Sequence, residues 1–306
     1  MQQIKQLMMH ASYSPFFQQK FGNLKTKGIS DLKSFTQRVP VMTLEELVEE
    51  RIRSRDPYSL RWCSNRTPLV AFQLEYDSES ALYLGLDRAA LRGYAEALRR
   101  CWSLLGLGKG DTVAIFDYGT SPVSYLASST FTPYLRQGAA DALGCLPVCN
   151  DGLANMSQRA VEILKFARPR VLFVRTDCLE PLAMEIERQL LRLADYTKAL
   201  VVAENEGLPS KRDQNAYEMR LGVPVYRLLR IDVAMFLAME CPDCHLLHSW
   251  QDLYFVESVA DRLDKSLVVT NWFAKACPTV RYLSQVRASL EPAGCPRGPQ
   301  DNRIVA

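Results

Sequence analysis

Histidine is scarce in this chain, with only three residues among 306. His10 lies near the start, whereas His245 and His248 lie together among cysteines, so no histidine is free to join a serine and an acid in a catalytic set. The G-x-S-x-G turn that exposes the nucleophile of many serine hydrolases does not occur either. We therefore do not expect serine-hydrolase chemistry.

Long apolar runs and blocks of basic residues are also missing. The most apolar stretches, 199–203 and 231–239, are far shorter than the roughly 18 residues that a membrane helix needs. The start of the chain lacks the apolar core of a secretory signal. A net charge of +3, from 37 Lys+Arg and 34 Asp+Glu, gives no broad electrostatic surface for nucleic acid or anionic lipid. The sequence thus predicts a cytoplasmic protein that binds neither nucleic acid nor membrane.

Nine cysteines are present, which is an odd number. Several of them, such as Cys145 and Cys178, lie in apolar surroundings. A chain of this length needs no disulfides to complete its core. We expect reduced thiols that mostly serve packing.

Short apolar runs alternate with helical stretches through the middle of the chain. The run 112–117 has the β-branched content and the flanking Gly and Asp residues of a buried strand. Similar runs and the helical stretches between them occur at 145–149, about 155–167, 170–174, about 180–194 and 198–203. Strands and helices in this order predict an α/β fold with a parallel, doubly wound sheet.

The region before these strands reads as helical and is punctuated by prolines. Thr43 and Glu46 form a capping box at the start of one amphipathic helix, and Asp87 caps another. We therefore predict an N-terminal helical region over residues 1–68 and an α/β subdomain over residues 69–239.

The pattern changes after about residue 240. Segments at 253–259, 266–271 and 279–283 read as β structure without intervening helices. The tail from Glu291 is too rich in proline and glycine for regular structure. We predict a smaller β-rich subdomain over residues 240–306.

A cluster of metal-binding residue types opens this last part. Cys241 and Cys244 form a C-x2-C knuckle, and His248 follows four residues later. Zinc takes thiolate and imidazole ligands at such short spacings. The alternative is that these are thiols of a surface turn beside a solvated histidine.

A fourth zinc ligand must come from elsewhere in the chain. Cys295 is the best candidate because it lies in a Gly-Cys-Pro turn that leaves its thiol free to point at a metal, and Cys277 and His245 are reserves. Four protein ligands would make the zinc structural rather than catalytic.

Nucleotide-binding loops of the common kinds are missing. Neither G-x-x-x-x-G-K-[ST] nor a strand followed by G-x-G-x-x-G is present. In doubly wound sheets, ligands bind in the crevice at the carboxyl ends of the strands. The candidates there are Tyr118, Gly119, Asn205 and Asp232. For Tyr118 and Gly119, a simple turn is an equal alternative.

Read in order, several segments resemble the adenylate-forming enzymes, and in particular their phenylacetate-CoA ligase-like branch. These segments are ASYSPFFQQKF from Ala11, VPVMT from Val39, LGLGKGDTV from Leu105, DYG from Asp117, EC from Glu240, LHSWQD from Leu247, LVVTN from Leu267, CPTVRY from Cys277 and GCPRG from Gly294. The resemblance is colinear over nearly the whole chain. It implies the fold of the N-terminal domain of these enzymes, with a doubly wound sheet and a smaller β-rich subdomain.

Enzymes of this family activate a carboxylate with ATP and Mg²⁺ to give an acyl-adenylate, and then transfer the acyl group to CoA. Some members hold a zinc ion in the segments that correspond to Cys241, His248 and Cys295. Arg297 stands where the family has a further cysteine, and Cys244 can take its place as the fourth ligand. The resemblance thus favours the zinc site.

The resemblance is poorest where the family binds nucleotide. After Leu74, in place of a loop rich in Ser, Thr and Gly, this chain has Glu75, Asp77 and Glu79 and no glycine before Gly85. Backbone amides cannot wrap phosphates closely without such glycines, and the added carboxylates repel a triphosphate.

Three further departures concern the nucleotide and the catalytic lysine. Of the family motif whose tyrosine lies near adenine and whose acid helps to hold Mg²⁺, only the acid remains, as Asp232. Val286 stands where a carboxylate takes the ribose hydroxyls. The sequence reaches Ala306 just after the last matching segment, where the family continues into a mobile C-terminal domain with a catalytic lysine.

These departures predict a degenerate member that keeps the scaffold, has lost adenylation and serves as a binding or partner subunit. A carboxylate or acyl ligand and a protein partner or homodimer are the expected partners. The alternative is an active ligase or acyl transferase with a variant nucleotide site, in which Asp232 holds Mg²⁺, Arg281 contacts phosphate and CoA accepts the acyl group. A metal-containing structural module without a doubly wound sheet is the third interpretation.

Overall fold

The computed structural model of the protein describes most of the chain. The described residues are 2–22, 29, 31–74, 81–118, 121–130, 134–150, 152–261, 264–291, 294–297 and 301–306. Gly119 and the acidic residues Glu75, Asp77 and Glu79, which the sequence analysis singled out, lie outside them.

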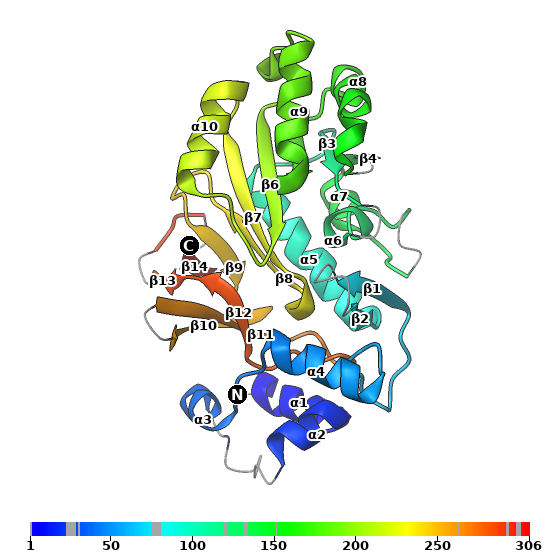
Figure 1. Ribbon diagram of the computed structural model, residues 1–306, viewed down its shortest axis with the longest axis vertical. Coiled ribbons are helices and arrows are strands. Elements are labelled where there is room, and N and C mark those ends of the chain that lie inside the picture. Colours follow the sequence, from blue (N-terminus) through cyan, green and yellow to red (C-terminus); the bar gives the residue numbers. More distant parts are fainter. Residues whose placement is uncertain are drawn as a thin grey trace.

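Among the described residues, four short α-helices form the N-terminal part, at the lower end of Figure 1. They are α1 (Gln2–Ala11), α2 (Pro15–Phe21), α3 (Leu32–Arg38) and α4 (Leu44–Ser54). The capping box predicted for α4 is confirmed, because the Thr43 N–H donates to Glu46 Oε2 at 3.0 Å and the Glu46 N–H to Thr43 Oγ1 at 3.3 Å. These two bonds satisfy amides that the helix itself leaves without partners.

A nine-stranded mixed sheet is the centre of the molecule, in the order β13-β14-β9-β8-β7-β6-β5-β3-β4. Its strands are β3 (Thr112–Phe116), β4 (Leu146–Asn150), β5 (Val171–Arg175), β6 (Ala199–Asn205), β7 (Val225–Ile231), β8 (Phe236–Glu240), β9 (Leu247–Trp250), β13 (Ser289–Leu290) and β14 (Asp301–Val305). Strands β4, β3, β5, β6 and β7 are parallel, and the remaining pairs are antiparallel.

Helices cover both faces of this sheet (Figure 1). On one face lie α5 (Arg88–Leu104) and α7 (Ala139–Leu143), and on the other lie α8 (Ser157–Ala167), α9 (Thr176–Arg188) and α10 (Lys211–Leu221). Both faces need cover because both are apolar, as strand β3 illustrates. Its residues Val113 and Ile115 belong to the core on the α5 side, and Ala114 and Phe116 belong to the core under α8 and α9. The predicted doubly wound α/β fold is confirmed.

Two smaller sheets complete the structure. The hairpin of β1 (Val70–Leu74) and β2 (Leu82–Leu86) lies next to the short helix α6 (Pro122–Tyr125), where Phe72 contacts Tyr125. Strands β10 (Tyr254–Asp261), β11 (Asp264–Asn271) and β12 (Tyr282–Arg287) form an antiparallel sheet beside the N-terminal helices. The predicted fold included such a smaller β-rich part, but β9, β13 and β14, which come from the same predicted range of residues 240–306, belong to the nine-stranded sheet.

Several element boundaries differ from the predicted ones. Helix α9 begins at Thr176 rather than near residue 180 and contains Pro181, and β12 begins at Tyr282 rather than at Thr279. After the proline-rich and glycine-rich tail, the chain forms a regular strand, β14. This strand is stabilised by the pairing of residues 301–304 with β9. The division near residue 240 stays a prediction, and main-chain hydrogen bonds cross it where β8 pairs with β9.

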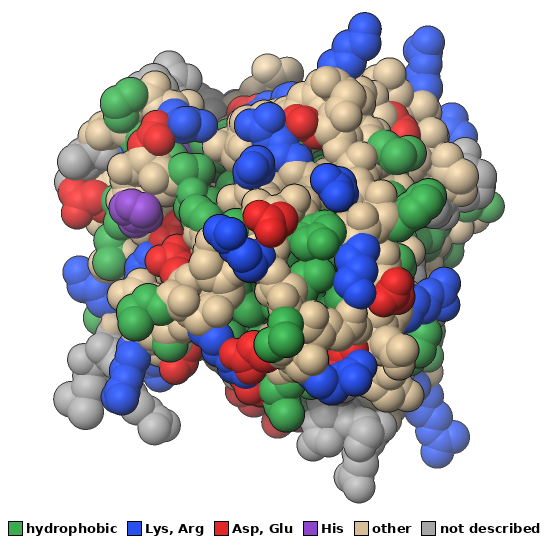
Figure 2. All heavy atoms as spheres, turned by 90° about the horizontal axis from the view of Figure 1, so that it is seen from above, with side chains coloured by type: hydrophobic (Ala, Val, Ile, Leu, Met, Phe, Trp, Pro, Cys, Tyr) green, Lys and Arg blue, Asp and Glu red, His purple; other side chains and the backbone are tan. Residues whose placement is uncertain are grey.

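The surface is mixed in charge. Figure 2, which views the molecule from above, shows basic and acidic side chains interspersed over that face. Within the described ranges, no helix combines the length and the apolar character needed to span a bilayer.

Candidate functional site

The turn between β8 and β9 brings three of the predicted metal ligands together. The Cys241 N–H donates to the Leu246 carbonyl and the His245 N–H to the Cys241 carbonyl, both at 2.9 Å. His245 adopts a left-handed conformation, with φ of 57°, that tightens this turn. Cys241 and Cys244 therefore lie close to His248, which is fully buried at the second position of β9.

Cys295 reaches the same place from the loop between β13 and β14. Its Sγ lies 3.9 Å from that of Cys241, and the Cys244 Sγ lies 3.1 Å from His248 Nε2. The four ligand atoms all lie within 4.8 Å of one another. The structure thus brings together the four residues that were predicted as ligands, whereas the reserves are not part of the group.

The geometry and the donor types of this Cys3His cluster suit a tetrahedral zinc ion. Zinc–sulfur bonds of about 2.3 Å and zinc–nitrogen bonds of about 2.0–2.1 Å place neighbouring ligand atoms about 3.5–3.8 Å apart. On its other side, His248 Nδ1 lies 3.0 Å from Asp301 Oδ2, and a carboxylate in this position orients a ligating imidazole. A metal held here would join the β8–β9 turn to the β13–β14 loop.

A second group of polar residues lies at the carboxyl ends of the parallel strands. Arg230, near the end of β7, is only 2% exposed, and its guanidinium lies between two buried carboxylates. Its Nη1 donates to Asp117 Oδ2 at 2.9 Å, and its Nη2 donates to Asp232 Oδ2 at 2.6 Å. A further bond of 3.2 Å joins Arg230 Nε to Asp232 Oδ1. The three side chains form one buried ion-pair network.

Neighbouring polar groups complete the hydrogen bonding of this network. Ser121 Oγ donates to Asp117 Oδ2 at 2.6 Å, and the Tyr94 hydroxyl donates to Asp232 Oδ1 at 3.3 Å. The main-chain N–H of Asp232 donates to Asn205 Oδ1 at 3.0 Å. Burial raises the pKa of Asp117, although Arg230 and Ser121 act in the opposite direction. Burial also raises the pKa of Tyr94 well above its ordinary value.

A cavity of about 230 Å³ opens beside this network, at the ends of β5, β6 and β7. Its lining residues are Arg175, Thr176, Asp177, Ala203, Glu204, Asn205 and Arg230. Arg175 lies over the Tyr118 ring, with 4.0 Å between its Cζ and the ring centroid, and forms two hydrogen bonds with Asp177. The cavity therefore carries both signs of charge.

The predicted crevice residues thus fall into three groups. Asn205 and Asp232 lie together, and Tyr118 adjoins them through Arg175, whereas Gly119 lies outside the described residues. Arg281 lies elsewhere, and its side chain bonds to Glu257, Thr36 and Val39 instead.

Arg281 joins the three-stranded sheet to the N-terminal helices. Its Nε and Nη2 donate to the two carboxylate oxygens of Glu257 at 2.9 Å. Its Nη1 donates to the carbonyls of Thr36, at 2.7 Å, and Val39. A phosphate contact by Arg281 would require the loss of some of these bonds.

Arg230 and Arg175 are the main site residues that the sequence analysis missed. The sequence does contain an indication that Arg230 belongs to the site. It is a charged residue inside the apolar strand Val225–Ile231 and lies two positions before Asp232. Its pairing with Asp117, 113 positions away, depends on the packing of strands and could not be read from the sequence.

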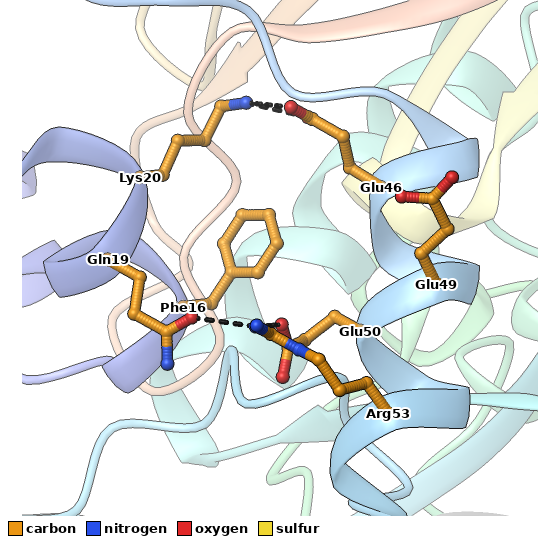
Figure 3. A pocket seen from close by; sticks show the side chains of 7 residues that line it. All are labelled: Phe16, Gln19, Lys20, Glu46, Glu49, Glu50 and Arg53. Atoms are coloured by element: carbon orange, nitrogen blue, oxygen red, sulfur yellow. Dashed lines mark hydrogen bonds and ion pairs between the residues drawn. The ribbon is translucent and has the colours of Figure 1, made fainter.

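A second cleft, of about 370 Å³, lies between α2 and α4, and Figure 3 shows it from close by. Lys20 faces Glu46 across its opening, with 2.5 Å between Nζ and Oε1. Arg53 donates to Gln19 Oε1 at 2.8 Å and also to Glu50. None of the predicted site residues lines this cleft, and its charged groups largely pair with one another.

The fold is also that of a CoA ligase whose solved structures contain an acyl-adenylate. No family model matches the chain, and no curated protein does. The similarity therefore comes from solved structures and concerns the fold.

The similar structures include several states of 2-hydroxyisobutyryl-CoA ligase. Its open conformation, in complex with 2-HIB-AMP and CoA, matches 99% of this chain and 72% of its own with a TM-score of 0.83 and 20% identity. Its postadenylation state with 2-HIB-AMP matches 99% of this chain and 65% of its own, with a TM-score of 0.82 and 20% identity. The chain thus spans about two thirds of the length of this ligase.

Proposed function

We propose that this protein is a catalytically degenerate relative of the phenylacetate-CoA ligase-like enzymes. In this proposal it has lost ATP-dependent carboxylate activation and acts as a binding subunit for a carboxylate or acyl ligand. The cavity at the ends of β5, β6 and β7 is the proposed ligand site, since this is where doubly wound folds bind their ligands.

The observation that carries the proposal is the pairing of Asp232 with Arg230. Asp232 is the carboxylate that the family resemblance assigns to Mg²⁺, and here both of its oxygens accept hydrogen bonds from the buried guanidinium. A magnesium ion at this position would have to displace Arg230 from a network in which it also neutralises Asp117. Arg230 would then keep only one of the two buried carboxylates that neutralise it, which is unfavourable.

The sequence around the expected nucleotide positions supports the same proposal. The segment after Leu74 carries three carboxylates and no glycine, and Val286 stands where the family has an acid for the ribose. Each departure removes a different contact to ATP, so a single substitution would not restore nucleotide binding.

Calorimetric titration with MgATP and an ATP–pyrophosphate exchange assay with a panel of carboxylic acids test the proposal. We expect neither heat of binding nor exchange from a sample whose unfolding is cooperative. Titration of the same acids without ATP tests the binding role. The Thr176→Val variant, which removes a hydroxyl from the cavity lining, should weaken any such binding.

Pyrophosphate exchange above background would contradict the loss of adenylation and favour the active ligase. In that case Asp232→Asn should abolish exchange, because Asp232 would be the Mg²⁺ ligand. The control is Asp213→Asn, at an exposed carboxylate in the first turn of α10, which should leave exchange unchanged.

We also propose that the Cys3His cluster holds a structural zinc ion. The residues that would hold it are Cys241, Cys244, His248 and Cys295, and four protein ligands leave no open position for catalysis. Zinc would contribute folding free energy by fixing the β8–β9 turn to the β13–β14 loop. Elemental analysis of protein purified without added metal tests this, and an absence of zinc would contradict it.

A further inference from the structure

The cavity at the carboxyl ends of β5, β6 and β7 is small and polar. Its volume of about 230 Å³ is below the roughly 300–1,000 Å³ of pockets that hold drug-sized ligands. Of its seven lining residues, only Ala203 has an apolar side chain. The cavity therefore suits a short ligand with several polar groups rather than a long acyl chain or an aromatic acid.

Both arginines of this cavity already have carboxylate partners. Arg230 lies between Asp117 and Asp232, and Arg175 forms two hydrogen bonds with Asp177. Two cations thus serve three carboxylates, and this part of the site has a negative excess before any ligand binds. A ligand with a negative charge alone would increase that excess, whereas a cationic group on the ligand would reduce it.

Glu204 adds a further carboxylate to the cavity lining. The half-buried side chain accepts a hydrogen bond from Thr176 Oγ1 at Oε2, at 2.9 Å, and no Lys, Arg or His in the described part of the chain pairs with it. Gly207 lies directly against this carboxylate, since a Cβ at that position would stand 2.6 Å from Glu204 Oε1. Glu204 is thus held in place and keeps lone pairs that can accept hydrogen bonds from an ammonium group.

The next residue, Asn205, supplies a donor to the same cavity. Its Oδ1 accepts a hydrogen bond from the main-chain N–H of Asp232 at 3.0 Å, which identifies the acceptor end of the amide. Among the residues that the structure describes, none accepts a hydrogen bond from the amide nitrogen of Asn205. Since Asn205 lines the cavity, this NH2 group can donate to a carboxylate of a ligand.

We propose that the ligand of this cavity is a small amino acid, whose ammonium group binds Glu204 and whose carboxylate binds the Asn205 amide. The inference rests on the proposed function, which places a carboxylate ligand in this cavity, and it adds the amine for which the site selects. Acceptor and donor come from consecutive residues at the end of β6, and both line the cavity. A zwitterion leaves the negative excess unchanged, and its ammonium group provides Glu204 with a cationic partner.

Calorimetric titration of the intact protein with 2-aminobutyrate, 2-hydroxybutyrate and butyrate tests the proposal. The three acids share one carbon chain and one carboxylate, and they differ only in the group on the second carbon. We expect 2-aminobutyrate to bind about 10-fold or more tightly than the other two acids, because a hydrogen bond between two charged groups is stronger than one to a neutral group.

Glu204→Gln keeps the shape of the side chain and removes its charge. It should bring the affinity for 2-aminobutyrate to within about threefold of that for 2-hydroxybutyrate, because an amide provides no charge for the ammonium group. The affinities for the other two acids should stay close to the wild-type values. The matched control is Glu162→Gln on α8, where the carboxylate is 61% exposed and lies outside the cavity lining, and it should keep the preference.

Gly207→Ala tests the position of the carboxylate rather than its charge. The φ angle of Gly207 lies outside the left-handed region, so an alanine residue fits the backbone there. Its methyl group would displace Glu204 Oε1 while Glu204 stays charged. The preference for 2-aminobutyrate should therefore fall in this variant too, and thermal unfolding close to that of the wild type shows that the variant is folded.

Three results would overturn the inference, and they are distinguishable from one another. If none of the three acids binds to the wild type, the proposed function fails as well. If 2-hydroxybutyrate and butyrate bind as tightly as 2-aminobutyrate, the carboxylate site stands and only the selection for an amine is wrong. If Glu204→Gln keeps the full preference for 2-aminobutyrate, the ammonium group binds elsewhere.

Discussion

Replacing Arg230 by methionine is the most direct test of the buried ion-pair network. The substitution keeps most of the side-chain volume and removes the cation that Asp117 and Asp232 share. Removing one partner of a buried pair costs about 3–5 kcal/mol, because it leaves an uncompensated buried charge. Since Arg230 pairs with two carboxylates, and all three side chains are at most 5% exposed, we expect a loss at the upper end of that range.

Urea unfolding at pH 7, followed by tryptophan fluorescence and circular dichroism, measures this loss. The slope of the unfolding free energy against urea should be unchanged, so that the shift in midpoint reports stability. The triple variant Asp117→Asn, Arg230→Met, Asp232→Asn should recover most of the loss, since it carries no buried charge. The control, Arg188→Met, removes an arginine whose own side chain is 64% exposed and that pairs with Glu185, so the midpoint should change little.

The pH dependence of the unfolding free energy of the Arg230→Met variant provides a second test, because the direction of the change with pH can be predicted. Burial already raises the pKa of Asp117 in the wild type, and removal of the guanidinium should raise it further. A carboxyl whose folded pKa lies above its unfolded value of about 3.9 destabilises the fold when it is ionised, and this cost disappears as the pH falls through the folded pKa. The deficit of the variant should therefore be largest at pH 7 and should shrink toward acidic pH. If Arg230→Met lowers the unfolding free energy by less than about 1 kcal/mol and this loss does not change with pH, the conclusion that the network stabilises the fold is wrong.

Three further predictions concern other parts of the structure. Cys295→Ser should bind less zinc than the wild type and unfold at a lower temperature, as measured by elemental analysis and calorimetry; equal zinc content would contradict the assignment of this ligand. Trp102→Ala, which removes the fully buried indole that packs against Phe173, should lower the unfolding free energy by about 3–5 kcal/mol in urea titrations, whereas a loss below about 1 kcal/mol would mean that the core refills the space. Hydrogen bonds from Arg100 hold the pKa of Asp252 below its ordinary value, so the stability from this pair is present above about pH 4 and is lost as the pH falls through the folded pKa. Asp252→Asn should accordingly cost under about 1 kcal/mol at pH 7, because the carboxylate is largely exposed, and the difference should vanish in acid titrations of stability.

The parallel half of the sheet could be predicted because its strands are short apolar runs with clear flanks. The segment 112–117, for example, shows β-branched residues between glycine and aspartate, and β3 occupies Thr112–Phe116. Buried parallel strands carry such continuous apolar patterns on both faces. The antiparallel continuation was not predicted, because Asp301–Val305 becomes a strand only through its pairing with β9.

The two candidate sites differ in how far the sequence determines them. Cys241, Cys244 and His248 are close in the chain, so their proximity follows from one turn, and the family resemblance supported Cys295 as the fourth member. The crevice depends on long-range packing, and so Arg230 was missed. A charged residue inside an otherwise apolar strand indicates a buried charge, but not which distant residue neutralises it.

The contacts of Arg281 have a consequence for the order in which the chain can fold during its synthesis. Thr36, whose carbonyl accepts a bond from Arg281, precedes it by 245 positions, and Met42 forms a parallel bridge with Tyr282. The N-terminal helices thus leave the ribosome long before the surface on which they pack exists. Until then, an apolar side chain such as Phe35, which is fully buried in the folded protein and contacts Phe255, must remain in water or bind a chaperone. Nascent chains released before residue 281 should consequently be the most sensitive to proteolysis at their N-terminal ends.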